Sequence, residues 1–455
     1  MKHSTLLLVL LLGAFSCETT GPPPPANPQI QLLAIDASCT EAWLEIRLPL
    51  GIQPRSISLH RDTHLVLSTT LVATETTIVD EGLFPNRSYI YTTTRPTVSQ
   101  SEQATVGVTT LDTTIHGGYT WSVDTLGDGN SSVLHDVAIV NDTLAIAVGR
   151  LSLRDTSGQI DPNAYSVAIW NGSSWSLQRL YYGGNNLIVP IRGVSVLGLN
   201  DIWLAAGSVF QWDGISSQTQ LSFSRLTLPN PNATIEKLSL STGLPLSGVG
   251  NVGAVVRKDG SSWQVMQSGT SVNLTDVSGN SSNSKVWAVG YQSDLSRSIV
   301  LEYDGQTWRV VRDPPVSVPS YPDSLSGIIT SIWSLTGRTI LAASSAGVYR
   351  FRSGSLGEAK RIWLPDPFSY GLFNRIRGNA SNNAFVVGAF GTIAHFNGVS
   401  WHQYPEFFNL SSDLNLLGLA VKENMVVAVG YTGDRAIVIR GKKVNTSHEK
   451  NREAP

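Results

Sequence analysis

The clearest copy of a recurring unit reads LTDVSG (Leu274–Gly279), then VWAVG (Val286–Gly290), then VLEYDGQTW (Val300–Trp308). A second copy, with the same order of an apolar run ending in Val-Gly and a later Asn-Gly turn followed by tryptophan, occupies residues 376–401. Asp-Gly or Asn-Gly between two β-type runs favours a tight hairpin, because both residues tolerate positive φ. Each unit is therefore predicted to form four short antiparallel strands.

The unit recurs throughout residues 115–441, at intervals of 40 to 58 residues. Four-stranded units of this length cannot bury both faces alone, so they must pack side by side, and the closed arrangement is a β-propeller. With Ser344 as a degenerate seventh copy, seven blades are predicted. The structural repeat residues are the Val-Gly glycines and the tryptophans: Gly149, Gly207, Gly250, Gly290, Gly388, Gly430, Trp121, Trp175, Trp263, Trp308 and Trp401.

The last unit, residues 426–441, stops before any tryptophan strand. The missing strand is present at the other end of the repeat region, at Gly118–Val123, which contains Trp121. A first strand that completes the last blade would close the ring and leave no open sheet edge. The repeats resemble those of lipoprotein propellers in the broad kelch, WD-repeat and sialidase-type superfamily, without the strict signature of any one family. This resemblance implies the fold and leaves the function open.

Residues 29–113 alternate short β-branched and aromatic runs with turn residues, which favours a small β-sandwich. The segment Leu83–Tyr91 resembles the tyrosine corner of fibronectin type III domains, in which Leu and Tyr stand six residues apart. The resemblance implies that the Tyr89 ring enters the core and that its hydroxyl bonds back to the turn. The predicted fold class is all-β: an N-terminal fibronectin type III-like β-sandwich followed by a seven-bladed β-propeller of four-stranded blades.

Residues 1–16 have the pattern of a secretory signal peptide: Lys2, an aliphatic run at Leu6–Leu12, and a small-x-small ending. The segment Leu12–Cys17 resembles a bacterial lipobox, which implies lipidation of Cys17, although Ala14 and Phe15 depart from the preferred residues. Ordinary cleavage, which would release a secreted protein, is the alternative. We expect an extracytoplasmic protein, on the bacterial outer membrane or cell surface if lipidated, with residues 17–28 as anchor and proline-rich tether and residues 442–455 as a disordered tail.

Composition excludes several classes of function. The balance of 32 basic and 34 acidic residues gives a net charge of −2, so no nucleic-acid partner is expected. Cys39 is the only cysteine besides Cys17, so no disulfide or zinc framework can be built. His60 and His64 flank a predicted hairpin turn, and no metal is expected there. The fingerprint-like run Gly248–Gly253 leads into a turn instead of a helix, and no cofactor is expected.

No catalytic constellation is evident in the sequence. Asp136 and Asp276 occupy equivalent places in predicted inner strands, which favours a framework role. Three arginines lie near inner strands: Arg192, Arg375 and Arg377. The remaining histidines of the repeat region are scattered among different repeat positions: His116, His135, His395 and His402.

The longest predicted connections all lie on one face of the propeller, and they carry aromatic residues in polar surroundings. Such rings suit stacking on sugars or anchoring a protein partner, although plugging the seams between blades is an equally good interpretation for any one ring. The leading hypothesis is a monomeric, non-catalytic protein that binds a glycan or envelope protein on this face. The candidate ligand-binding residues are Tyr181, Tyr182, Tyr321, Phe368, Tyr370, Phe373, Tyr404 and Phe407.

Two alternatives remain open at this stage. The protein could be a polysaccharide-acting enzyme, a glycosidase or lyase that uses the same face, or a scaffold for another envelope complex. Clustering of two carboxylates or of the arginines at one mouth of the propeller would favour the enzyme. An exposed apolar aromatic patch without such groups would favour binding or scaffolding.

Overall fold

The computed structural model describes residues 30–51, 53–94, 103–129, 131–240, 244–280, 285–313, 325–334, 338–352, 359–364 and 373–444. The chain divides into two compact units, Met1–Leu111 and Asp112–Pro455. The predicted signal peptide, Cys17, the tether and the tail beyond residue 444 lie outside the described residues. Within the described ranges, no helix is long and apolar enough to cross a membrane.

The first unit contains two antiparallel sheets that share one hydrophobic core. One sheet has the order β1 (Gln31–Ala37), β2 (Glu41–Arg47), β5 (Glu75–Glu81). The other has the order β4 (His64–Leu71), β3 (Arg55–Arg61), β6 (Ser88–Thr94), β7 (Thr105–Thr109). Leu44 and Ile46 from the first sheet and Leu59 from the second belong to the same buried cluster. Alternate side chains of each strand therefore meet between the sheets.

The Tyr89 corner has the geometry that the motif predicts. The ring is buried, and its hydroxyl accepts a hydrogen bond of 2.9 Å from the backbone N–H of Phe84. His60 and His64 lie on β3 and β4, on either side of a two-residue turn, as the hairpin interpretation required.

In the part of the second unit that the structure describes there are seven sheets, numbered here in chain order, with antiparallel pairing apart from one parallel pair in sheet 2. Sheets 1 and 2 comprise β9 (Val133–Asn141), β10 (Leu144–Leu151), β11 (Tyr165–Trp170) and β12 (Trp175–Gln178), then β15 (Gly193–Gly198), β16 (Asp201–Ala205), β17 (Val209–Trp212) and β18 (Gln218–Phe223). A short hairpin between them, β13 (Tyr181–Tyr182) and β14 (Asn186–Leu187), extends sheet 2, with β13 parallel to β18.

The next three sheets follow the same plan. Sheet 3 comprises β19 (Ile235–Ser239), β20 (Ser247–Gly250), β21 (Val255–Asp259) and β22 (Ser262–Met266); sheet 4 comprises β23 (Asn273–Asn280), β24 (Lys285–Tyr291), β25 (Ser298–Tyr303) and β26 (Trp308–Arg312); and sheet 5 comprises β27 (Ile329–Ser334), β28 (Thr339–Ser344), β29 (Gly347–Arg352) and β30 (Lys360–Trp363).

The last two sheets complete the unit. Sheet 6 comprises β31 (Phe373–Ala380), β32 (Asn383–Gly388), β33 (Ile393–Phe396) and β34 (Trp401–Gln403), and sheet 7 comprises β35 (Asn415–Lys422), β36 (Met425–Thr432), β37 (Arg435–Lys443) and β8 (Tyr119–Leu126). The described helical segments are short: α1 (Pro405–Phe408) and the 3-10 turns Arg225–Thr227 and Asn251–Gly253.

The sheets form a closed ring because each one packs on two neighbours. Seven buried apolar clusters each draw residues from two successive sheets, and one of them joins Val427 of sheet 7 to Ala147 of sheet 1. The first strands also contact one another in order, and β35 contacts β9. The hydrophobic core is thus divided among the seams between the sheets.

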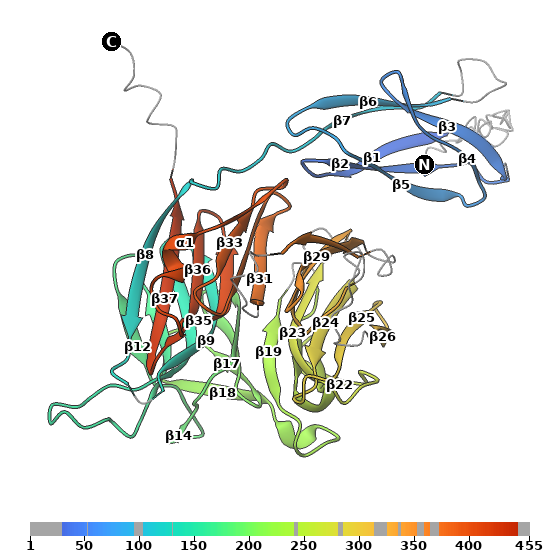
Figure 1. Ribbon diagram of the computed structural model, residues 1–455. Coiled ribbons are helices and arrows are strands. Elements are labelled where there is room, and N and C mark those ends of the chain that lie inside the picture. The colour runs from blue at the N-terminus through green and yellow to red at the C-terminus, as the bar shows by residue number, and fades with distance from the viewer. Residues whose placement is uncertain are drawn as a thin grey trace, which may run out of the picture. The chain divides into compact units, whose positions relative to one another are not determined.

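The predicted closure by the N-terminal strand is present. Strand β8 pairs along its whole length with β37, from Leu126 opposite Ala436 to Tyr119 opposite Lys443. Figure 1 shows the two strands side by side, β8 in teal and β37 in red. The pairing extends to Lys443, so the last strand ends two residues later than the predicted boundary at residue 441.

A β-bulge recurs near the start of the first strand. In sheet 4, Leu274 faces Gly290 and Asp276 faces Val289, which leaves Thr275 as the extra residue. The same irregularity is found in the first strands of the sheets other than sheet 2. A bulge bends its strand and redirects the extra side chain. The extra residues are His135, Glu236, Thr275, Thr330, Asn374 and Leu417.

The repeat glycine accommodates this bulge. A Cβ atom at Gly290 would lie 1.9 Å from the carbonyl oxygen of Asn273, and one at Gly430 would lie 1.9 Å from that of Asn415. The bulged strand brings its backbone close to the position opposite, which favours glycine there, although Ser344 occupies the position in sheet 5.

Substitution of this glycine should destabilise the second unit. We expect Gly290→Ala to lower the free energy of unfolding by about 3 kcal/mol, because the new methyl group overlaps backbone that cannot move independently. Gly198→Ala is the matched control, since a Cβ there meets no atom within 4 Å, and its effect should stay within about 0.5 kcal/mol. Denaturant unfolding of the two full-length variants measures both. Equal stability of the two variants would contradict this role of the bulge.

Candidate functional site

A central pocket is lined by one residue at the equivalent position of every sheet, with a volume of about 470 Å³. Six of these residues are the bulge residues, and Arg192, which directly precedes β15, takes the place in sheet 2. The pocket therefore follows from the repeat itself, because each bulge turns one side chain toward the axis of the ring. The seven residues, called the mouth residues below, are His135, Arg192, Glu236, Thr275, Thr330, Asn374 and Leu417.

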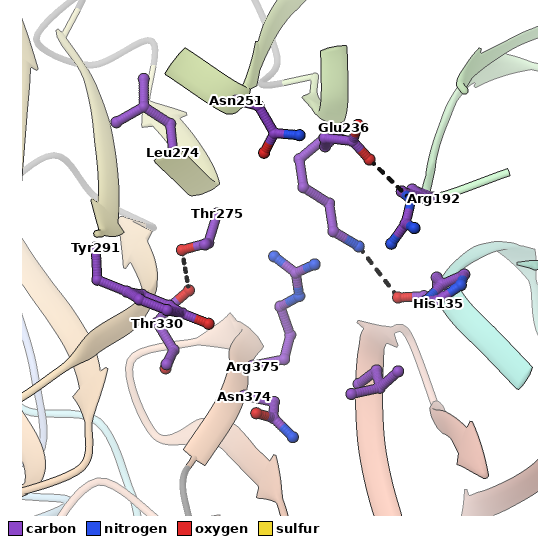
Figure 2. Close-up of a pocket in the computed structure, with 12 residues that line it drawn as sticks. His135, Arg192, Glu236, Asn251, Leu274, Thr275, Tyr291, Thr330, Asn374 and Arg375 are labelled. Carbon is purple, nitrogen blue, oxygen red and sulfur yellow. Dashed lines mark hydrogen bonds and ion pairs between the residues drawn. The ribbon is translucent and has the colours of Figure 1, made fainter. Parts of the chain in front are cut away.

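The pocket lies on the face that the loop lengths predicted. Asn251 and Tyr291, which also line it, directly follow the repeat glycines at the ends of β20 and β24. The connections from second to third strands and from fourth strands to the next sheet both begin or end here. Figure 2 shows Tyr291, Thr330 and Thr275 on one side of the pocket and Arg192 and Glu236 on the other.

The residue after each mouth residue forms a second layer. In five sheets it is polar or charged, and in the other two it is Gly193 or Gly418. A Cβ at Gly418 would lie 2.7 Å from the Cα of Asp136, so the polar groups of this layer meet where the glycines leave room. We call the following residues, with Arg377 two positions further along β31, the girdle: Asp136, Lys237, Asp276, Ser331, Arg375 and Arg377.

Asp276 is the centre of the girdle. Its carboxylate accepts hydrogen bonds from Arg375 Nη1, from both terminal nitrogens of Arg377 at 2.6 and 2.9 Å, from Ser331 Oγ at 2.5 Å and from the backbone N–H of Ile332 at 3.0 Å. Burial alone would raise the pKa of Asp276, but the guanidinium groups of Arg375 and Arg377 outweigh it and hold the pKa well below its usual range. The carboxylate is thus permanently ionised and fully engaged.

Asp136 and Lys237 form a second pair beside it. Lys237 Nζ lies 3.3 Å from Asp136 Oδ2 and donates to the carbonyl oxygen of His135 at 3.1 Å. Asp136 also accepts from the backbone N–H of Val137 at 3.1 Å. Burial, followed by the charge of Arg375, lowers the pKa of Lys237 to about 8. Lys237 therefore remains mainly protonated at neutral pH.

Two charged groups and a histidine stand above the girdle. Arg192 Nε lies 3.1 Å from Glu236 Oε2, and the Arg192 side chain is 48% exposed. Burial, with the charges of Lys237 and Arg192, lowers the pKa of His135 to about 3. The imidazole is neutral at physiological pH, because burial and the neighbouring cations both disfavour its charged form.

The structure separates the predicted aromatic residues into three groups. Tyr181 and Tyr182 lie on β13 and are partly exposed, with the ring of Tyr182 packed 5.3 Å from that of Phe210. Phe373, Tyr404 and Phe407 are buried in the seams between sheets, so their assignment as ligand-binding rings is corrected: they fill the space where the loops turn inward. Tyr321, Phe368 and Tyr370 lie outside the described residues.

Five of the repeat glycines stand opposite the residue before a bulge, and Gly207 instead lies beyond the second strand of its sheet; the five are Gly149, Gly250, Gly290, Gly388 and Gly430. Gly250 and Gly388 end the second strands β20 and β32, and Gly207 follows β16 with a φ of +74°. Trp175, Trp308 and Trp401 begin fourth strands, and Trp263 is the second residue of β22. Trp121 lies on β8, the fourth strand of sheet 7.

Three of the four repeat-region histidines come together in space, although they stand at different repeat positions as the sequence indicated. His116 Nδ1 and His395 Nδ1 lie 3.0 Å apart, and the His116 and His402 ring centroids lie 5.3 Å apart. His395 faces His402 across the hairpin at Asn397-Gly398, a pairing that the turn motif implies. Burial, with the neighbouring histidines, lowers the pKa of His395 to about 3. The cluster fastens the segment before β8 to sheet 6.

Carboxylates and arginines do cluster at the axis, but their pairing leaves no acid–base pair. A general acid needs a carboxyl that holds a proton near neutral pH, which Asp276 cannot do. Glu236 is paired with Arg192, and Asp136 with Lys237. Among the described residues, no group of three or more His, Cys, Asp or Glu side chains is arranged to hold a metal ion. What the site offers is a rigid, polar concavity with positive groups at its floor.

Comparison with known proteins finds similarity in structure only. No family model matches the chain, and no curated protein matches it. A solved structure described as YCF48 bound to D1 peptide matches with a TM-score of 0.51 and 16% identity, over 71% of this chain and 95% of that one. The WD40 β-propeller domain of Doa1 matches with a TM-score of 0.49 and 12% identity, over 71% of this chain and 96% of that one. YCF48 from Cyanidioschyzon merolae matches with a TM-score of 0.46 and 13% identity, over 70% of this chain and 98% of that one. The first similarity places the chain among β-propellers.

Removing the carboxylate of Asp276 should destabilise the second unit. We expect Asp276→Asn to lower the free energy of unfolding by about 3–5 kcal/mol, because Arg375 and Arg377 would be left as buried charges without a counter-ion. Denaturant unfolding of the full chain measures this. A loss below about 1 kcal/mol would show that the girdle is hydrated and does not hold the sheets together.

Stability should also fall in mild acid. His135 and His395 bind protons near pH 6.5 when unfolded but only near pH 3 when folded, so the unfolded state takes up more protons between these values and the free energy of unfolding decreases as pH falls. The expected slope is up to about 1.4 kcal/mol per pH unit for each histidine. Unfolding between pH 6.5 and 4.5 measures it, and His395→Gln should reduce it. A flat profile would contradict the burial of neutral imidazoles.

Proposed function

We propose that the chain is a non-catalytic binding protein that recruits a partner protein at the central pocket of its second unit. The observation that carries this proposal is the central pocket itself. It is concave, it draws one residue from every sheet, and a girdle of ion-paired side chains closes its floor. Binding sites are commonly pre-formed concavities of 300–1,000 Å³ with a few fixed polar groups.

A protein partner fits this site better than a glycan. Sugar recognition by stacking needs exposed rings, and three of the candidate rings, Phe373, Tyr404 and Phe407, are buried in the seams between sheets. The YCF48 structure with the similar fold was solved with a peptide. A peptide segment also has the mixed polar and apolar character of a lining that combines Asn251 and Asn374 with Leu274 and Leu417.

We infer that the second unit is a seven-bladed β-propeller in which each four-stranded sheet is a blade. The closed order of first strands and the shared β8–β37 sheet support this. We infer likewise that residues 29–113 form a fibronectin type III-like spacer, supported by its two sheets and by the Tyr89 corner.

The location of the protein is part of the proposal. Residues 1–16 as signal peptide, Cys17 as lipid attachment site and residues 17–28 as tether would place a monomeric protein outside the cytoplasm, on the bacterial outer membrane or cell surface. If Cys17 is not lipidated, the same leader would release a secreted protein. In either case the partner would be an envelope or extracellular protein.

Truncating side chains that line the central pocket should weaken binding of the partner protein. We expect the double variant Tyr291→Ala, Leu417→Ala to lose at least ten-fold in affinity for a partner recovered with the wild-type full chain, because both side chains line the central pocket. The control Leu240→Ala, Val421→Ala truncates two partly exposed residues in the pocket on the other side of the girdle. Affinity measurements with the purified partner test both, with released reducing ends assayed in parallel on cell-wall polysaccharides.

The outcomes separate the functional classes. Equal losses in the two double variants would overturn the assignment of the face. Product released from polysaccharide by the wild-type chain would replace the binding function with the enzymatic one.

A further inference from the structure

The mouth and girdle residues together carry an unbalanced positive charge. Four cationic side chains of the mouth and girdle (Arg192, Lys237, Arg375 and Arg377) face three anionic ones (Asp136, Glu236 and Asp276), so 4 − 3 leaves one excess positive charge among the described residues at the axis. A buried charge without a counter-ion is costly, and proteins retain one where a ligand supplies the counter-ion.

The excess charge is held by groups that still have donors to offer. The Arg375 side chain is only 3% exposed, and its Nε–H has no hydrogen-bond partner among the described residues. Its Nη2 lies 4.0 Å from Asp136 Oδ1, which is beyond hydrogen-bond distance. Lys237 uses its ammonium group on His135 O and Asp136, which leaves one of three N–H donors. Figure 2 shows the guanidinium of Arg375 reaching into the centre of the pocket.

The polar walls around these cations are fixed by bonds to their neighbours. Asn374 Nδ2 donates to Asn415 Oδ1 at 2.7 Å and to Leu416 O at 2.8 Å. Thr275 Oγ1 donates to Thr330 O at 2.9 Å. Asn251 Nδ2 donates to Thr234 Oγ1 at 2.9 Å. The lining is thus pre-organised, and a ligand does not have to order it.

We propose that the central pocket binds a carboxylate group of the partner, held above Arg375 and Lys237 with Arg192 at the rim. This inference rests on the proposed function and names the chemical group that the pocket takes. One carboxylate supplies the one negative charge that the pocket lacks, and it accepts charge-assisted hydrogen bonds from guanidinium and ammonium groups. The rest of the pocket, which Leu274 and Leu417 help to line, accommodates the residue that carries the carboxylate.

The carboxylate can come from a chain terminus or from an Asp or Glu side chain. Four acetylated tripeptides distinguish these sources: Ala-Ala-Ala with a free carboxyl end, its amide, Ala-Glu-Ala amide and Ala-Gln-Ala amide. Binding to the full-length chain is measured by ligand-observed NMR. We expect one carboxylate peptide, or both, to bind at least ten-fold more tightly than its neutral counterpart.

Two lysines with the same kind of contact provide the matched test. Lys237→Gln removes the excess charge and keeps a donor for His135 O, and we expect it to weaken carboxylate binding at least ten-fold. Lys422→Gln removes the same charge from a lysine that donates to Val140 O at 2.8 Å on the other side of the girdle, and it should leave binding unchanged. If Lys237→Gln does not fold, Leu417→Glu, which places an anion at a partly exposed mouth position, should abolish binding instead.

The results distinguish this inference from the proposed function. Absence of binding by both carboxylate peptides, or equal losses in the two lysine variants, would overturn the carboxylate site. If the affinity for the partner is unchanged by Lys237→Gln, the carboxylate site would also be overturned, but the proposed recruitment of a partner at the central pocket would not. If the carboxylate peptides bind but the Tyr291→Ala, Leu417→Ala variant keeps its affinity for the partner, the carboxylate site would be supported and the proposed function would be overturned.

Discussion

The bulge opposite the repeat glycine is the constraint on which the rest of the second unit depends. An unbulged first strand would continue its alternation of side chains toward the two adjacent seams. The extra residue breaks the alternation once, so that one side chain, such as Thr275, reaches the pocket and the next, such as Asp276, reaches the axis. In sheet 4, Gly290 leaves free the space that a Cβ would occupy, and in sheet 5 the bulge forms opposite Ser344.

The same constraint explains the composition of the axis. The first strands of the seven sheets converge there, and the space at the axis is too small for a side chain from each of them at the same level. Glycine at positions 193 and 418 removes two of them, and a Cβ at Gly193 would lie 2.8 Å from the carbonyl oxygen of Glu236. The remaining side chains are polar and pair with one another across sheets that are distant in the chain. Such pairs fix which sheets face each other as well as how far apart they lie.

Sequence patterns predicted the elements well because their causes are local. The Asn397-Gly398 turn sets the register of its hairpin, and the incomplete last unit implied the pairing of β8 with β37. The partners of Asp276 could not be derived in this way, because Arg375 and Arg377 lie about 100 residues away and nothing local selects them. Phe373 and Tyr404 were misassigned for a related reason: a position in a connection does not determine whether a ring turns to solvent or into a seam.

A column of the repeat nevertheless contained the site. The register of the first and second strands places the mouth residues at one equivalent position, 13 to 15 residues before the repeat glycine or Ser344, and most of the girdle at the next position. Framework columns of a repeat tend to keep one type of residue, since each copy solves the same packing problem. The mouth residues instead comprise six residue types at seven positions, from leucine to arginine, on a backbone that is the same in nearly every sheet. Variation on a constant scaffold is how one fold acquires a particular ligand, so the binding specificity proposed above would be set by the mouth residues.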